Sequence, residues 1–341
     1  MATLADVARR AGVSSATASR IINGSSKPVA GELRERVLAA VAELQYVPNA
    51  HAQLLARPQR SVIGVIVHDV SDPYFAEITR GLQRVATDHG RLVIICNSYR
   101  DPDKEVEYVE LLRAQQVAAI VLAGSGYQDA AVTAALEAKL RAYQAVGGRV
   151  AVIGRHEYGG DAVVPDNEAG GHLLGAELYA AGHRRIGVIA GPRGLTTTTD
   201  RLAGLRRAAR EFGRALPARR IRYADFDRAG GAAAAGALLD AEPELTALVA
   251  LNDVMAVGAL GLLRSRGLSV PERVSLVGFD DMPVASDVTP ALTTVRLPLA
   301  EMGARAMTMA LRQSRRGAAA RVEPVAAELV RRDSVAAPPA D

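Results

Sequence analysis

The stretch TLADVARRAGVSSATASRIING, from Thr3 to Gly24, decides the fold of the N-terminal part of the chain. Thr3 and Asp6 have the spacing of a capping box, in which a hydroxyl and a carboxylate satisfy free amides at the start of a helix. Apolar residues then recur at helical spacing up to Ala11, and Gly12 supplies the backbone freedom that a sharp turn needs. The pattern predicts a first helix over residues 4–11, followed by a turn.

A second helix is predicted after this turn, with Ser14 as its N-cap and its end near Asn23. The residues of this part that can face a core are Val13, Ala18, Ile21 and Ile22. A third helix over about 31–45 has an apolar side formed by Leu33, Val37, Leu38, Val41 and Leu44. Three such helices are typical of a helix-turn-helix head, whose second helix lies in the major groove of DNA. A three-helix bundle that docks another protein is the alternative.

The net charge of the chain is concentrated in this head. The first 60 residues contain eight Lys and Arg against four Asp and Glu, so they carry +4, which is the formal net charge of the whole chain. The other residues contain 33 of each sign and sum to zero. A basic head on a neutral body favours nucleic-acid binding over protein docking.

The head is followed by Tyr46, Pro48, Asn49 and the run AQLLA at 52–56, and with this combination the chain resembles the LacI/GalR family of transcription regulators over essentially its full length. The resemblance implies a hinge helix here, with Leu55 wedged into the minor groove at the centre of an operator. About eight residues are fewer than the roughly 12 to 15 that an isolated helix needs. The hinge is therefore expected to fold only against a partner hinge and DNA. An ordinary linker, with its leucines packed on the body, is the alternative.

The resemblance also assigns DNA contacts to residues of the head. It implies that Ser15 and Ala16 read bases and that Arg20 reaches a base, as a bidentate donor to guanine. Leu55 completes the expected base contacts. The expected phosphate contacts are Leu4, Thr17, Ser19 and Asn23. Ala30 departs from the family pattern, in which a serine commonly caps the third helix.

The rest of the chain shows a different pattern, in which short β-branched runs alternate with amphipathic helical stretches. The runs are SVIGVIV (61–67), LVIIC (92–96), AAIVLA (118–123), VAVIG (150–154), RIGVIAG (185–191), ALVAL (247–251) and VSLVGF (274–279). Continuously apolar strands separated by helices predict parallel sheets that are buried on both faces. About 270 residues of this pattern are too many for one sheet, so we expect two doubly wound lobes.

The predicted domains are a three-helix helix-turn-helix head over 1–46, a hinge helix and linker over 47–60, and an α/β effector-binding and dimerisation domain over 61–332, like that of periplasmic binding proteins. Lobe 1 is expected at about 61–155 and 285–313, and lobe 2 at about 156–284 and 318–332. The resemblance implies the return to the first lobe through residues 293–313, and a final strand near 328–332 is expected to rejoin the second. Residues 333–341 are expected to be a disordered tail.

Ligands of such sheets bind beyond the carboxyl ends of the strands, where this sequence places polar and aromatic residues. The resemblance implies that seven of them contact a small-molecule effector: His68, Tyr74, Ser125, Arg201, Phe226, Asn252 and Asp280. Arg, Asn and Asp can bond adjacent hydroxyls, and an aromatic ring suits the C–H face of a sugar. Structural alternatives exist, since Asn252 can cap the following helix and Asp280 can close a turn.

One position of this site departs from the family pattern. Gly154 stands where many relatives have an aspartate, so either the ligand differs or a neighbour such as Arg155 replaces that contact. The threonines at 196–199 are interpreted as a polar strand-end loop. The effector is predicted to be a sugar, with a purine nucleobase or nucleoside as the alternative.

The sequence contains no motif of an enzyme or a metal site: HExxH, GxSxG, CxxC and the Walker lysine are absent. We therefore expect no catalytic residue, no metal and no cofactor. The single cysteine, Cys96, fits a reducing compartment, and neither a signal peptide nor an apolar run of about 18 residues is seen. A cytoplasmic, nucleoid-associated protein without a membrane partner is predicted.

Together these features predict a homodimeric, sequence-specific transcriptional repressor that binds a near-palindromic operator and responds to a small molecule. Two alternatives belong to other classes. A solute-binding module of the periplasmic kind would account for residues 61–332 but would leave the presence of residues 1–57 unexplained. An enzyme on the same scaffold would need a nucleophile, a base or a metal cluster.

Overall fold

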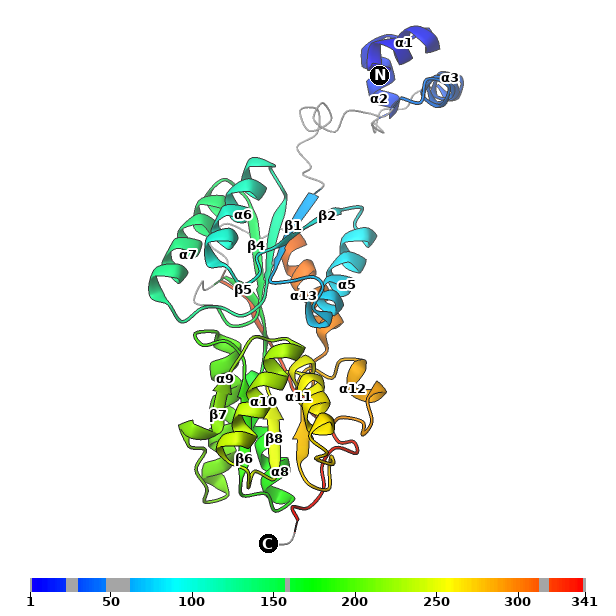
Figure 1. Cartoon of the computed structure of the whole chain (residues 1–341). Helices are drawn as coiled ribbons and strands as arrows, with labels where there is room; N and C mark the ends of the chain where they lie inside the picture. The colour runs from blue at the N-terminus through cyan, green and yellow to red at the C-terminus, as the bar shows by residue number, and fades with distance from the viewer. Residues whose placement is uncertain (1, 23–29, 47–61, 157–159, 313–318, 340–341) are drawn as a thin grey trace. The chain divides into compact units, whose positions relative to one another are not determined.

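The chain consists of two compact units, Met1–Arg60 and Ser61–Asp341 (Figure 1). A computed structural model describes residues 2–22, 30–46, 62–156, 160–312 and 319–339. The predicted hinge over 47–60 lies outside the described residues, and so do Asn23 and Leu55.

The first unit contains helices α1 (Leu4–Ala11), α2 (Ser15–Ile22) and α3 (Gly31–Glu43), as predicted. Thr3 and Asp6 form the expected capping box: the Asp6 amide donates to Thr3 Oγ1 at 3.3 Å, and the Thr3 amide donates to the Asp6 carboxylate at 3.0 Å. Gly12 ends α1 in the left-handed region, with φ +64°. Ser14 then caps α2 by accepting from the Thr17 amide at 3.1 Å.

The core of this unit is small and made mainly of short side chains. Its buried members are Val7, Ala8, Ala11, Ala18, Val37 and Ala40. Leu38 was predicted to join them but is 47% exposed. Helix α3 packs through Val37, Ala40, Val41 and Leu44, and position 38 lies outside this stripe because successive helical residues differ by about 100°. Helix α3 also begins without a side-chain cap from Ala30.

In the second unit, six parallel strands of the described chain form the first sheet, in the order β11-β5-β4-β3-β1-β2. Their bounds are β1 (Val62–Val67), β2 (Leu92–Asn97), β3 (Ala119–Ala123), β4 (Arg149–Ile153), β5 (Asp161–Pro165) and β11 (Val322–Val325). Helices α5 (Pro73–Asp88) and α13 (Leu299–Leu311) cover one face, and α6 (Pro102–Ala114) and α7 (Ala130–Ala145) cover the other (Figure 1). Val65 of β1 faces α5 and Ile66 faces α6, which explains why the strand is apolar at every position.

The second sheet has the order β7-β6-β8-β9 and is also parallel. Its strands are β6 (Ile186–Ala190), β7 (Ile221–Tyr223), preceded by the short helix η1 (Ala218–Arg220), β8 (Ala247–Ala250) and β9 (Ser275–Val277). Helices α8 (Asn167–Ala180) and α9 (Thr196–Glu211) pack on one face, α10 (Arg228–Ala241) and α11 (Asp253–Ser265) on the other. Helix α12 (Val284–Asp287) follows, and β10 (Thr294–Arg296) pairs antiparallel with β12 (Glu328–Val330) beside this sheet.

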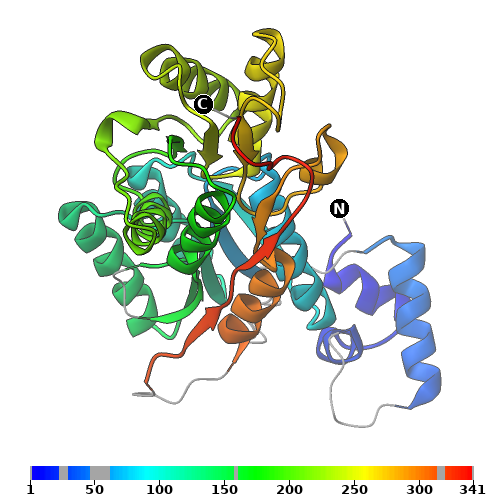
Figure 2. The same cartoon turned by 90° about the horizontal axis from the view of Figure 1, so that it is seen from below.

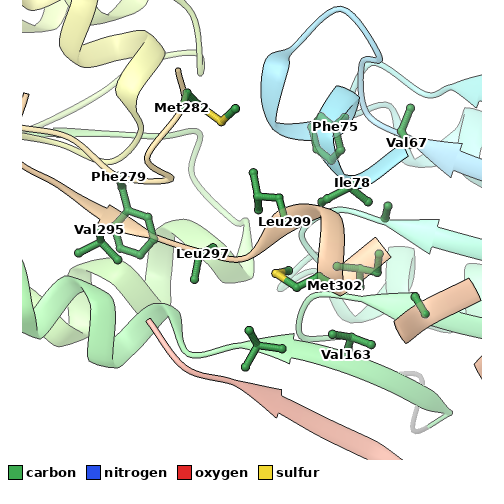
Figure 3. Packing of buried hydrophobic residues seen from close by; sticks show 14 of the residues in the cluster. Val67, Phe75, Ile78, Val163, Phe279, Met282, Val295, Leu297, Leu299 and Met302 are labelled. Carbon is green, nitrogen blue, oxygen red and sulfur yellow. The ribbon is translucent and has the colours of Figure 1, made fainter. Parts of the chain in front are cut away.

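The chain returns to the first lobe at α13, which packs against α5 at very short range. A Cβ added to Gly81 would lie 1.8 Å from the Ala300 carbonyl oxygen, and one added to Gly303 would lie 2.1 Å from that of Ile78. In Figure 3 the segment through Leu297 leads from Phe279 and Val295 of the second lobe to Met302 of the first. The described chain passes between the lobes after β5, after β10 and after β11.

The predicted lobe boundaries are wrong at three strands. Residues 285–313 were expected in lobe 1, but β10 pairs with β12, and the Asp280 amide donates to the Val295 carbonyl, so β10 lies with the second lobe. Residues 156–284 and 318–332 were expected in lobe 2, but β5 pairs with β4 and β11 pairs with β5, so both belong to the first sheet. Strand β5 contains only Ala162, Val163 and Val164 as apolar residues between Asp161 and Pro165, and such a short run carries no signal for the sheet that it joins.

The prediction of a disordered tail over 333–341 is also wrong for its first residues. Ser334 is buried, and its hydroxyl accepts from the Thr293 amide at 2.8 Å and donates to the Leu276 carbonyl. The Ala336 amide donates to Ser275 Oγ at 3.1 Å. Figure 2 shows this last segment, in the darkest red, running along the second lobe. One serine and backbone pairing fix it, which composition does not reveal.

Candidate functional site

The exposed start of α2 is the candidate DNA-reading face of the first unit. Ser15, Ala16 and Arg20 are exposed, whereas Ala18 between them is fully buried. Because the cap at Ser14 fixes the first turn, α2 presents short side chains and one guanidinium to solvent from an ordered helix.

The residues expected at phosphates have different surroundings. Leu4 is half-buried and packs on the core of the unit, so it can reach a phosphate through its backbone amide at the start of α1. Thr17 and Ser19 are half-buried on α2, and Thr17 Oγ1 lies 2.9 Å from Ser14 Oγ. Asn23 lies outside the described residues, as does Leu55.

All seven residues expected at an effector line one cavity of the second unit. The cavity contains about 380 Å³ of space between atoms, including its opening. The seven residues come from both lobes, mostly from the carboxyl ends of strands, and are His68, Tyr74, Ser125, Arg201, Phe226, Asn252 and Asp280. Their convergence follows from the parallel sheets, whose strand ends meet at one edge.

Arg201 is the centre of the second lobe's half of the cavity. It is almost fully buried on α9, and its Nε donates to Asn167 Oδ1 at 2.8 Å. One terminal nitrogen donates to the Leu251 carbonyl and the other to Asp280 Oδ1 at 2.8 Å, while the guanidinium lies 3.5 Å from the centroid of Phe279. These bonds hold Arg201 in place without a ligand.

Asp280 follows β9 in an unusual backbone conformation. Its φ of +103° is rare for a residue with a side chain, and the turn is held by a bond from its amide to the Val295 carbonyl at 2.7 Å. Burial raises the pKa of Asp280 to about 7, although Arg201 opposes the shift. The carboxyl can therefore accept or donate a hydrogen bond near neutral pH.

Asn252 caps a helix and also lines the cavity. Its Oδ1 accepts from the Met255 amide at 2.8 Å and so caps α11, and the residue also lines the cavity. The adjacent Asp253 is fully buried behind it, where the Thr294 hydroxyl donates to one carboxylate oxygen at 2.6 Å and the Met282 amide to the other at 2.7 Å. Burial raises the pKa of Asp253 well above its ordinary value.

In the first lobe, His68 is positioned by a buried polar cluster that the sequence did not reveal. Its Nε2 lies 3.4 Å from Glu105 Oε1, which also accepts from Ser98 Oγ at 3.2 Å and from the Tyr127 hydroxyl at 3.0 Å. Phe75 packs on the imidazole edge-on, with 5.3 Å between ring centroids. The imidazole orientation is thus fixed before a ligand arrives.

The two lobes are bonded to each other beside the start of α9. Ser125 Oγ donates to Thr197 Oγ1 at 2.6 Å, and the Thr196 amide donates to the Gly126 carbonyl at 2.9 Å. Arg155 forms two bonds to Asp200, at 3.0 and 2.8 Å. The Arg155 guanidinium is therefore engaged by α9.

The geometry around Gly154 explains why no aspartate stands there. Its φ is +109°, and a Cβ would lie 2.2 Å from the Gly124 carbonyl oxygen. Any side chain would thus need both a strained backbone and a shift of the neighbouring strand end.

Five further residues line the cavity without having been predicted: Asp72, Phe75, Arg100, Gly124 and Thr197. Asp72 caps α5 and Phe75 lies in its first turn, after β1, where the strand-end signal was present but did not single them out. Thr197 was interpreted as part of a loop but lies in the first turn of α9. Arg100 follows β2, at the edge of the sheet, where contact with a cleft is not expected from sequence.

Within the described ranges no helix is long and apolar enough to span a bilayer. The same ranges hold no group of three or more His, Cys, Asp or Glu able to bind a metal ion.

Comparisons with known proteins cover both units. Residues 3–49 match the model of bacterial regulatory proteins of the lacI family, and residues 60–323 match the model of periplasmic binding proteins and the sugar binding domain of the LacI family. A solute-binding module would not account for the first of these matches.

Individual relatives agree over nearly the whole length. The transcriptional regulator GalS of Salmonella typhimurium is 37% identical over 98% of this chain and 97% of its own. GalR of Escherichia coli is 36% identical over 91% of this chain and 89% of its own. The structure of the Lac repressor dimer bound to operator and the anti-inducer ONPF is 29% identical, covers 98% of this chain and 99% of that one, and has a TM-score of 0.86. These proteins are regulators by name, in agreement with the prediction that the chain is not an enzyme.

Proposed function

Because this chain belongs to the LacI family of bacterial regulatory proteins, we propose that it represses transcription from a near-palindromic operator and that a sugar bound in its cleft controls this repression. The chain is a DNA-binding transcriptional regulator with a small-molecule effector domain. The observation that carries the sugar assignment is the convergence of seven polar and aromatic side chains on one cavity.

Base reading is assigned to α2. Ser15 and Ala16 are exposed at its start and small enough to let the helix approach base edges, and Arg20 is exposed one turn later. Thr17, Ser19, Asn23 and the Leu4 amide would contact phosphates, which position the helix without specifying sequence. Leu55, outside the described residues, is assigned the role of a minor-groove wedge at the operator centre.

The chemistry of the cavity supports a sugar as the effector. Asp280 and Asn252 offer oxygen acceptors and an amide donor for hydroxyls, and Arg201 orients Asp280. Burial raises the pKa of Tyr74, so its phenol stays protonated and can donate. The Phe226 ring supplies an apolar wall for a C–H face. A purine nucleobase or nucleoside is the competing ligand that the experiment must include.

A homodimer is proposed to form along β2, at the edge of the first sheet. Leu92, Ile94 and Ile95 of this strand are 69%, 41% and 39% exposed. An open edge with exposed apolar side chains invites pairing unless something covers it. A second copy would cover it through a two-fold contact, and two-fold symmetry matches a near-palindromic operator.

Control is proposed to act through the position of the lobes. Ligand binding in the cleft would favour one arrangement of the two lobes, and thereby favour or disfavour folding of the hinges on DNA. A coupling of about 1–3 kcal/mol changes operator affinity roughly 5- to 150-fold. Since the DNA target is chromosomal, the protein is proposed to act in the cytoplasm.

The proposed function is tested by first identifying the DNA sequence that the protein binds. Full-length protein selects duplexes from a random library, and the enriched duplex is then titrated with protein in the presence of monosaccharides, disaccharides and nucleosides. We expect a near-palindrome to be enriched and a sugar to shift its affinity. A response to nucleosides alone contradicts the sugar assignment, and enrichment of no sequence contradicts the assignment of α2 as a base reader.

A further inference from the structure

The cleft of the second unit consists of two chambers in series. The inner chamber is the cavity of about 380 Å³ described above, and the outer one contains about 1050 Å³, part of it open to solvent. Among the described residues, Asp72, Arg100 and Phe226 line both chambers. These three side chains therefore form the partition between them.

Arg100 is the centre of this partition. Its Cζ lies 5.4 Å from the centroid of the Phe226 ring, which belongs to the other lobe, and its Nη2 lies 3.7 Å from Asp72 Oδ2. Its Nε is buried and has no hydrogen-bond partner among the residues that the structure describes. A buried donor without a partner is unfavourable, so this N–H is a place for an acceptor from outside the chain.

The backbone that presents Arg100 is strained. Tyr99 and Arg100 have φ values of +54° and +61°, in the left-handed region that residues with side chains rarely adopt. The turn is held by bonds from the Tyr99 amide to the His68 carbonyl at 2.7 Å and from the Asp101 amide to the Ser98 carbonyl at 3.0 Å. Glycine would form this turn without strain, but it would leave the partition without a guanidinium.

The outer chamber combines acceptors with apolar surface. Asp69, Asp225 and Asp227 contribute carboxylates, and Val254 and Val284 contribute apolar side chains. Carboxylates accept from hydroxyls and apolar groups suit C–H surface, which is the combination that a sugar ring requires. With Asp72, four carboxylates line this chamber against two cations, Arg100 and Arg228, so a neutral ring fits better than a phosphorylated or acidic one.

We propose that the effector is a neutral glycoside of two sugar rings, one in each chamber, and that Arg100 selects it by donating its Nε–H to an oxygen at the junction of the rings. This inference rests on the proposed sugar-effector function. A monosaccharide would occupy the inner chamber and leave the Arg100 Nε–H without an acceptor. The junction oxygen of a disaccharide would lie at the partition, where the guanidinium is already held over Phe226.

The test is calorimetric titration of the full-length protein with glucose, cellobiose and maltose, and with galactose, lactose and melibiose. We expect at least one disaccharide to bind ten-fold or more tightly than its monosaccharide.

Arg100→Asn, which tolerates the left-handed backbone, should remove that advantage and leave monosaccharide affinity within about three-fold. Arg100→Lys keeps the charge but lacks the Nε–H, and should also lose the advantage. Arg113→Ala, which removes an exposed cation of α6 in the same lobe and lines neither chamber, is the matched control and should retain it.

Other outcomes overturn the proposal in distinguishable ways. An equal loss for monosaccharide and disaccharide in Arg100→Asn, or tighter disaccharide binding, contradicts selection by Arg100. Binding of monosaccharides without any disaccharide contradicts the two-ring ligand but leaves the sugar-effector function standing. Binding of none of the six sugars, with operator binding intact, contradicts both the two-ring ligand and the sugar effector.

Discussion

Arg201 and Asp280 form an ion pair inside the cleft, with 2.8 Å between Nη2 and Oδ1, and only 2% and 5% of the two side chains are exposed. Both residues belong to the second lobe, and Arg201 is bonded in addition to Asn167 and to the Leu251 carbonyl. The second lobe's half of the cavity is therefore shaped by its own bonds before any ligand binds. This pair has a structural function as well as a place in the proposed site.

Arg201→Ala is expected to destabilise the second unit by about 3–5 kcal/mol, because the Asp280 carboxyl would remain buried without its cation. Denaturant unfolding of the full-length protein measures the change. Arg207→Ala is the control: this arginine lies on the same helix but pairs with Glu168 at the surface, and its loss should cost less than about 1 kcal/mol. Similar losses in both variants would contradict a structural role of the buried pair.

Asp280→Asn is expected to change how stability depends on pH. Burial raises the pKa of Asp280 to about 7 in the folded protein, from 3.8. Between these values the folded state holds a proton that the unfolded state has released, so the carboxyl lowers stability as pH rises, by up to about 1.4 kcal/mol per pH unit. Asparagine does not titrate. The stability of wild type minus that of the variant should thus fall from about pH 4 to pH 7 and stay constant above. Melting temperatures at several pH values measure it, and parallel curves would contradict the shifted pKa.

Strand-end logic depends on local pattern alone and indicated the region of the cavity, whereas the family resemblance selected seven of the residues that line it. His68, Ser125 and Asn252 directly follow apolar runs, and parallel sheets bring such positions together. The capping box at Thr3 and the turn at Gly12 were equally local. These features need no knowledge of which strands are neighbours.

What the sequence did not reveal depends on pairing and on three-dimensional packing. The pairing of β11 with β5 decides the lobe boundary, and Ser334 is ordered by partners some 41 and 58 residues away. Arg100 reaches the cleft through a turn with left-handed backbone at Tyr99 and Arg100. Such a turn is usually predicted from glycine or asparagine, and neither residue stands at these two positions. Leu38 is exposed because the side of α3 that packs on the core includes Val37 and Val41 but not position 38.

Ile94→Asp is expected to convert the proposed dimer into a monomer, because a charge on the edge strand β2 would be buried between two copies. Val322→Asp is the matched control, since Val322 is 60% exposed on β11, at the opposite edge of the same sheet. Light scattering coupled to size exclusion gives the mass of each variant. A monomeric wild type, or a dimer unaffected by Ile94→Asp, would exclude this edge as the contact.

Arg20→Ala is expected to relax sequence preference at one operator position, with a loss of about 1–3 kcal/mol on the preferred base pair. Arg34→Ala removes the same charge from α3 and serves as the control. Anisotropy titrations with the selected operator, its single-base variants and a random duplex distinguish the two. If Arg20→Ala weakened all duplexes equally, Arg20 would be a phosphate contact instead.

The central claim, that occupancy of the cleft controls operator binding, is tested most directly by reciprocal titration of one sugar and one operator. Operator affinity is measured with and without saturating sugar, and sugar affinity with and without saturating operator. The account predicts a change of roughly 5- to 150-fold, of the same factor in both directions, because coupling between two sites is reciprocal. A sugar that binds in the cleft yet leaves operator affinity unchanged, with its own affinity unaffected by the operator, would contradict the account.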